Sequence, residues 1–162
     1  MNSAVQCVSN VPSLVSYFLN GEWKEDVNKD NKLGSKGAMS SSYEDLLKQM
    51  YCNKFTCIVP RDLKTTIGKF APQFQGYEQQ DTQELLSYLI SGLHEDLKKP
   101  MKPLENQEQQ KIESNTVEIE QSKIMDIFGG KLKSTIKCLG CETLFEKYEP
   151  LMYYFFFLIF IF

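Results

Sequence analysis

Two cysteines near the end of the chain, Cys138 and Cys141, have the Cys-x-x-Cys spacing of a metal-binding knuckle. Thiolates are common ligands of structural zinc, but a closed site needs four ligands, typically from two such knuckles. The pair is therefore interpreted as an incomplete Zn²⁺ site. Two other interpretations stay open, a redox pair and two inert thiols, although no thioredoxin-like βαβ pattern surrounds the pair.

Two acidic residues, Asp81 and Glu84, stand three positions apart at the expected start of a helix. One helical turn brings both carboxylates to one face, where they could accept backbone N–H groups from an extended peptide. The same pair suits helix capping, with Asp81 as the N-cap and Glu84 in the first turn, where the helix dipole favours an acid. Both roles can hold at once.

The sequence contains one histidine, His94, within the same predicted helix. A catalytic interpretation makes it the base that activates Cys7, because nucleophilic cysteines need a neighbouring base. A structural interpretation gives His94 a hydrogen bond or solvent contact and makes Cys7 a small core residue. The structural interpretation is favoured for both, and Cys52 and Cys57 are predicted to be ordinary free thiols.

The charges are nearly balanced, with 18 Lys and Arg against 21 Asp and Glu and a net charge of −3. This balance gives no basic footprint for nucleic acid or for an anionic membrane. Five cysteines are an odd number, and the first residues carry no basic signal-peptide region. A disulfide framework is therefore not expected, and a reducing, cytoplasmic location is predicted.

The last twelve residues, Leu151–Phe162, are all apolar. A bilayer span needs roughly 20 such residues, so this run is too short to be a membrane helix. It is interpreted as a buried strand without its partners, or as sequence that is foreign to the original reading frame.

Apolar spacing predicts several helices before residue 98. The clearest runs from about Asp81 to Lys98, because its apolar residues recur with a period near 3.6. Its buried face is predicted to consist of Leu85, Leu86, Leu89, Ile90, Leu93 and Leu97. A short helix is expected around Ala4, Val5 and Val8, and Pro12 suits the first turn of a second short helix with Leu14, Val15, Phe18 and Leu19 on one face.

Residues 20–40 are polar and contain glycine, which predicts a loop. Ser41 followed by Glu44 is a capping-box pattern and predicts a helix start. The residues expected to be buried in that helix are Tyr43, Leu46, Leu47 and Met50. Pro60 is expected to begin another helix, in which Leu63, Ile67 and Phe70 face the core.

Residues 99–123 are rich in Lys, Glu and Gln and contain no aromatic residue, which indicates a polar linker or insertion. From 131 to 138 apolar or small residues alternate with Lys and Thr, which predicts a strand. Residues 143–148 are expected to return as the second strand of a hairpin, with a turn at Leu139–Gly140.

Three stretches together resemble the ubiquitin-specific proteases, a papain-like family of cysteine deubiquitinases. Met1–Asn10 is similar to the second half of the family's cysteine box. Gly76–Leu85, with Gly92–Leu97 after it, resembles the glutamine-aspartate box almost letter for letter. Phe128–Cys141, followed by Phe145 and Glu149–Pro150, is similar to a strand and the first knuckle of the zinc-bearing fingers.

The resemblance implies an α+β fold that is part of the papain-like ubiquitin-specific protease fold. Residues 1–98 would form the helical thumb, 124–150 the start of the β fingers, and 151–162 an apolar tail of unclear origin. It also implies that Asp81 and Glu84 hold ubiquitin's C-terminal tail, with Gln80 lining the same channel. Cys138 and Cys141 would be zinc ligands, and the partner would be ubiquitin or a ubiquitinated protein.

In that family the nucleophilic cysteine stands three residues before the position of Asn2, and the catalytic histidine lies in a later box. Neither falls within these 162 residues. The resemblance thus implies a fragment of a deubiquitinase that is inactive as given. The alternatives are a non-catalytic remnant that binds ubiquitin or another partner, and a small membrane-associated protein, against which the short apolar tail argues.

Overall fold

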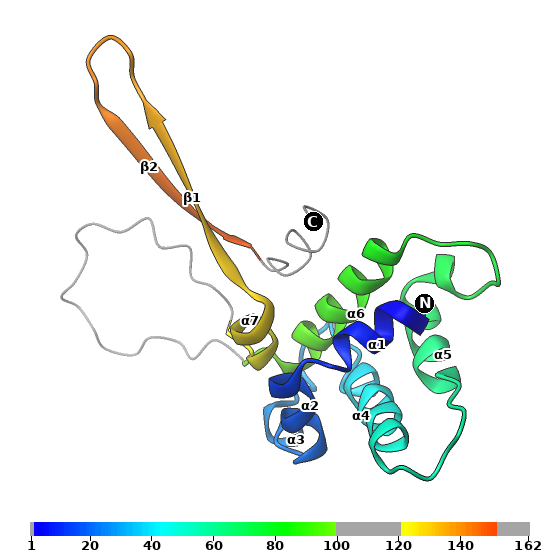
Figure 1. Cartoon of the computed structure of the whole chain (residues 1–162). Coiled ribbons are helices and arrows are strands. Elements are labelled where there is room, and N and C mark those ends of the chain that lie inside the picture. The colour runs from blue at the N-terminus through cyan, green and yellow to red at the C-terminus, as the bar shows by residue number, and fades with distance from the viewer. Residues whose placement is uncertain (1, 100–120, 152–162) are drawn as a thin grey trace.

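The computed structural model describes residues 2–99 and 121–151, which form a group of packed helices and a two-stranded antiparallel hairpin that extends away from them (Figure 1). The helical elements before the hairpin are α1 (Asn2–Val8), α2 (Pro12–Leu19), α3 (Trp23–Asp26), α4 (Ala38–Tyr51), α5 (Arg61–Phe70), the 3₁₀ helix η1 (Pro72–Phe74), α6 (Thr82–Leu97) and α7 (Lys123–Phe128). The strands are β1 (Gly130–Lys137) and β2 (Leu144–Leu151).

Helix α6 is the central element of the core. It packs against α1, α4 and α7, and all six of its predicted apolar positions are buried. Its bounds confirm the prediction from period 3.6, and Asp81 is its N-cap. The short helices α1 and α2 are also confirmed, with Pro12 in the first turn of α2.

Helix α4 begins at Ala38, one turn before the predicted capping box. The capping-box interpretation of Ser41 and Glu44 is therefore wrong. Glu44 is 4% exposed and forms ion pairs with Lys48 at 2.9 Å and with Lys24 at 3.3 Å. Glu44 thus joins α4 to α3 instead of capping α4. Tyr43, Leu46 and Leu47 are buried as predicted, whereas Met50 is only partly buried.

The segment 20–40, predicted as loop, contains the single turn of α3 and is held firmly against the end of α6. Asn31 Nδ2 donates to the Glu95 carbonyl oxygen at 2.7 Å, and the Asn28 backbone N–H donates to the Asp96 carbonyl oxygen at 2.9 Å. Asn28 Nδ2 also donates to the Lys98 carbonyl oxygen at 3.1 Å. These bonds supply partners for carbonyl groups that a helix C-terminus leaves without intrahelical donors.

Two positions that were predicted to be buried are exposed. Phe70 is 51% exposed, because the core beneath the end of α5 is filled instead by Phe74 and Ala71. Cys7 is exposed, whereas it was predicted to be a small core residue. The buried stripe of α1 consists of Ala4, Val5 and Val8, and Cys7 lies outside it.

Helix α7 was not predicted. It begins after Ser122, whose Oγ accepts a hydrogen bond from the Met125 backbone N–H at 3.1 Å and thereby caps the helix. Its residues Ile124 and Phe128 are buried, and the helix packs against α6 and α2. The chain is thus attached to the helical core immediately before the hairpin.

The predicted hairpin is confirmed, with Ile136 opposite Phe145 and Leu132 opposite Glu149. Residues directly opposite each other share a face of an antiparallel pair. Leu132, Ile136 and Phe145 therefore lie on one face of the hairpin, and they are between 48% and 65% exposed. Figure 1 shows both strands extending beyond the helices, with α7 at their base.

In the described ranges 2–99 and 121–151, no helix is both long and apolar enough to cross a membrane. The predicted apolar tail, residues 151–162, lies outside those ranges except for Leu151. Most of the predicted polar linker over 99–123 also falls outside them, so both assignments stay predictions.

Candidate functional site

Asp81 occupies the position just before α6 and caps it. Its Oδ1 accepts hydrogen bonds from the backbone N–H groups of Gln83 at 2.6 Å and Glu84 at 3.2 Å. Both capping bonds go to the same oxygen, so Oδ2 takes no part in the cap. Asp81 is exposed, which leaves its carboxylate accessible to another molecule.

Glu84 and Gln80 lie beside Asp81 at this end of α6, and both are exposed. Glu84 Oε1 accepts a hydrogen bond from Gln73 Nε2 at 3.3 Å, which links the first turn of α6 to η1. The three residues singled out by the sequence therefore form one exposed cluster of acceptors. Gln73 was not predicted to join it, because its contact crosses a turn whose geometry no local motif reveals.

His94 has the structural role that the sequence favoured. It is 4% exposed, and its Nδ1 lies 2.7 Å from Ser122 Oγ, so it fixes the residue that caps α7. Cys7 is exposed on α1. This arrangement assigns His94 to packing and gives no support to the interpretation of His94 and Cys7 as a catalytic pair.

Cys138 and Cys141 flank the turn of the hairpin, and both are exposed. The Cys138 backbone N–H donates to the Thr143 carbonyl oxygen, and the Glu142 N–H donates to the Cys138 carbonyl oxygen, each at 2.9 Å. Thr143 Oγ1 lies 3.1 Å from Cys141 Sγ. Hydrogen bonding from the Thr143 hydroxyl to the thiolate, with further help from Cys138, lowers the pKa of Cys141 to about 7.

The cysteine pair supplies two ligands of the kind that zinc prefers. No third His, Cys, Asp or Glu joins them within the part of the chain that the structure describes. A structural zinc site takes four ligands. These residues therefore fit half of such a site, and its other ligands would have to come from outside the described residues.

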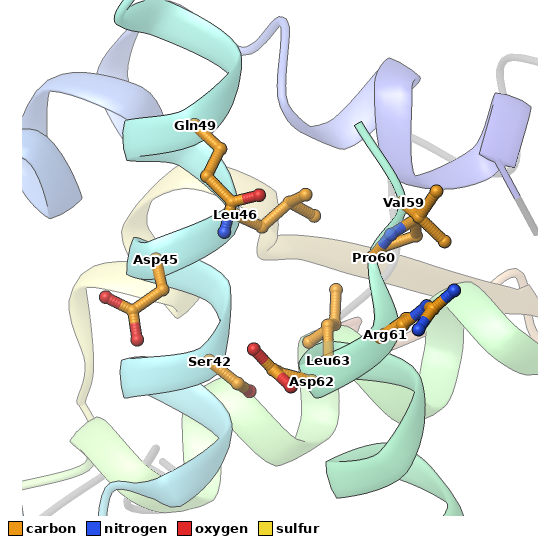
Figure 2. A pocket seen from close by; sticks show the side chains of 9 residues that line it. All are labelled: Ser42, Asp45, Leu46, Gln49, Val59, Pro60, Arg61, Asp62 and Leu63. Carbon is orange, nitrogen blue, oxygen red and sulfur yellow. The ribbon is translucent and has the colours of Figure 1, made fainter. Parts of the chain in front are cut away.

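A small pocket lies between α4 and the start of α5, and it does not include the exposed cluster of Asp81, Glu84 and Gln80. Figure 2 shows Ser42, Leu46 and Gln49 on α4 facing Pro60 and Leu63. None of the site residues that the sequence singled out lines this pocket. The exposed cluster at the start of α6 therefore remains the candidate site.

A family model described as ubiquitin carboxyl-terminal hydrolase matches residues 1–147. The chain belongs to the ubiquitin carboxyl-terminal hydrolase family. Ubiquitin carboxyl-terminal hydrolase 15 of Homo sapiens and of Rattus norvegicus are each 44% identical to it, and ubiquitin carboxyl-terminal hydrolase 4 of Mus musculus is 42% identical. Each alignment covers 94% of this chain and 17% of the relative.

The chain thus spans about a sixth of the length of the curated relatives it matches, at 17% of each. The family assignment that was made from three sequence stretches is confirmed. The mixture of helices with a small antiparallel sheet is consistent with part of the papain-like fold of ubiquitin carboxyl-terminal hydrolases, as the α+β prediction required.

Proposed function

We propose that these residues are part of a thiol-dependent deubiquitinase, which hydrolyses bonds at the C-terminal glycine of ubiquitin. In this proposal, the N-terminal end of α6 receives ubiquitin's C-terminal tail. Family membership over residues 1–147 supports the reaction class. The observation that carries the binding role is the exposed cluster of Asp81, Glu84 and Gln80 at one helix end.

The chemistry of the cluster suits an extended peptide. Such a peptide presents backbone N–H groups, and carboxylates are acceptors only. Asp81 can cap α6 through Oδ1 while Oδ2 accepts an N–H from the tail, and Glu84 offers a second acceptor one turn along. The amide of Gln80 can both donate to and accept from the tail.

The role proposed for these residues is binding, and bond cleavage is assigned to other parts of the enzyme. Cysteine hydrolysis needs a thiolate, a base and an oxyanion site. The histidine of this chain is buried against Ser122 and acts in packing. A non-catalytic chain that binds ubiquitin through the same cluster is the alternative function, and the variants described next apply equally to both.

Two single substitutions separate tail binding from helix capping. Serine is about as good an N-cap as aspartate but lacks the second oxygen, so Asp81→Ser should preserve the helix while removing the acceptor for the tail. Glu84→Gln keeps size and removes charge. We expect each to weaken ubiquitin binding about tenfold, since a hydrogen bond to a charged group contributes roughly 1.5–3 kcal/mol and these groups are exposed.

The measurement is the dissociation constant for ubiquitin, obtained by calorimetry together with a melting curve of each variant. Asp81→Ala serves as the matched control, because it should lose both the cap and the tail contact and also melt earlier. Unchanged affinity in both Asp81→Ser and Glu84→Gln would contradict the proposed tail site.

We also propose that Cys138 and Cys141 contribute two thiolates to a Zn²⁺ site completed by ligands outside the described residues. Alkylation by iodoacetamide requires the thiolate, so we expect Cys141 to react with a midpoint near pH 7, its lowered pKa. The alkylation rate should fall progressively as the pH drops below 7 and level off above it, because it follows the thiolate fraction of Cys141. Zinc, once bound, should protect both cysteines.

The control for this experiment is Thr143→Val, which removes the largest cause of the lowered pKa. The midpoint of Cys141 alkylation should then move to higher pH. Mass spectrometry of the tryptic peptide identifies the modified cysteine. A midpoint that is the same in both proteins would show that the Thr143 hydroxyl does not set the pKa. Rapid alkylation in saturating zinc, measured on a longer protein that supplies the other ligands, would contradict the zinc site.

A further inference from the structure

The loop between η1 and α6 has no buried side chain of its own to hold it in place. Residues 75–81 are all exposed, and Tyr77 is 99% exposed. A loop without buried contacts keeps one conformation only where specific interactions hold it. This loop leads into Gln80 and Asp81. Interactions that fix the loop therefore also determine the position of these two residues of the exposed cluster.

One side chain of α5 makes two contacts with this loop. Lys64 Nζ donates a hydrogen bond to the Gly76 carbonyl oxygen at 2.9 Å. The same Nζ lies 4.3 Å from the centroid of the Tyr77 ring, within the range of a cation–π interaction. A single ammonium group therefore holds both the backbone and the side chain at the start of the loop.

A second contact fixes the position of the loop relative to α5. Gln75 Nε2 donates to the Gly68 carbonyl oxygen at 2.9 Å. A Cβ added to Gly68 would lie 2.8 Å from Gln75 Cγ, so this close approach requires glycine. Gly68 stands four residues after Lys64, so both anchors lie on the same face of α5.

We propose that Lys64 is a positioning residue for the tail site. Lys64 holds Gly76 and Tyr77 against α5 and thereby determines where Gln80 and Asp81 lie at the start of α6. The cap at Asp81 fixes one end of the six-residue stretch from Gly76 to Asp81, and Lys64 fixes the other. This inference rests on the proposed tail-binding function and adds a residue from another helix to it.

The test uses the full chain and three variants. Lys64→Met keeps the aliphatic stem and the helix preference but removes the charge and the donor. Lys64→Arg keeps a cation that can donate to the carbonyl oxygen and lie on the ring. Lys69→Met is the matched control, because Lys69 is exposed on α5, and the structure of the described ranges shows no hydrogen bond, ion pair or cation–π interaction between its ammonium group and residues 75–81.

Two readouts are measured for each protein, backbone ¹⁵N relaxation of residues 76–80 and the dissociation constant for ubiquitin. In Lys64→Met we expect the loop order parameters to fall from near 0.85 to below about 0.6, and ubiquitin affinity to fall about threefold to tenfold. Lys64→Arg should restore both values in large part. Lys69→Met should change neither.

The outcomes separate this inference from the proposed function. Unchanged order parameters in Lys64→Met would overturn the positioning role, whether or not ubiquitin binds. If the loop loosens but ubiquitin affinity stays the same, Lys64 orders the loop without serving the tail site, and the proposal is wrong. If the unsubstituted chain does not bind ubiquitin at all, the proposed function fails, and the order parameters alone decide whether Lys64 positions the loop.

Discussion

Replacing Asp96 with alanine should lower the free energy of unfolding by about 3 kcal/mol, because it leaves the donors of half-buried Ser35 and buried Ser40 without their acceptor. Asp96 is completely buried near the end of α6. Its carboxylate accepts hydrogen bonds from the Ser35 backbone N–H at 2.6 Å and from Ser35 Oγ at 2.6 Å. Within the described residues, its hydrogen-bond donors are neutral N–H and O–H groups.

The same carboxylate caps a different helix. The Ser40 backbone N–H, in the first turn of α4, donates to Asp96 Oδ2 at 3.3 Å, and Ser35 Oγ accepts from the Met39 N–H at 2.7 Å. The helix dipole also favours an anion at the start of α4. Gly34 permits this approach, since a Cβ there would lie 2.9 Å from the Glu95 carbonyl oxygen. Loss of Asp96 should therefore loosen α4 and the 28–37 loop together.

Urea unfolding followed by circular dichroism measures this effect. Asp96→Asn is the graded control, because one amide oxygen can still accept while the NH₂ group faces donors. The free energy of unfolding of Asp96→Asn should lie between those of the unsubstituted chain and Asp96→Ala. A loss below 1 kcal/mol in Asp96→Ala would contradict the role of this carboxylate as a buried cap.

Phe18→Ala should lower the free energy of unfolding by about 3–5 kcal/mol, the usual range for removing a buried aromatic side chain. Phe18 has no exposed surface and lies at the centre of an aromatic cluster. Its ring centroid is 5.0 Å from that of Tyr43, 5.5 Å from that of Tyr17 and 5.8 Å from that of Trp23. The substitution would leave a cavity where α2, α3 and α4 meet.

The control for Phe18→Ala is Phe18→Leu, which keeps most of the volume and should cost less than half as much. The slope of the unfolding free energy against urea concentration should be the same for both variants and the unsubstituted chain. A shift of the urea midpoint then reports a change in stability. If Phe18→Ala and Phe18→Leu unfold at the same urea concentration as the unsubstituted chain, the cluster is not part of the cooperative core.

Local signals predicted the elements that are stabilised locally. Helix α6 follows from its apolar period and from Asp81, whose capping partners lie two and three residues away. Asp81 and Glu84 could be placed together for the same reason, since helical geometry alone brings positions three apart to one face. The strands of the hairpin follow from simple alternation.

Several of the features that were missed depend on residues distant in sequence. Helix α4 starts early because its first turn is capped from Asp96, which lies 56 residues further along than Ser40. The loop over 20–40 is ordered by bonds to α6 that no local motif specifies. At the site, Lys64 donates to Gly76, 12 residues further along the chain, and Gln73 donates to Glu84, 11 residues further along. These roles could be recognised only in the tertiary structure.

Chemical-shift mapping with ubiquitin tests the central claim most directly. The ¹⁵N-labelled chain is titrated with intact ubiquitin and, in parallel, with ubiquitin lacking its C-terminal tail. We predict that intact ubiquitin shifts the amide signals of residues 76–84, around Asp81 and Glu84, and that tailless ubiquitin does not. Equal shifts with both proteins, or shifts that leave residues 76–84 unaffected, would contradict the assignment of this helix end to the tail.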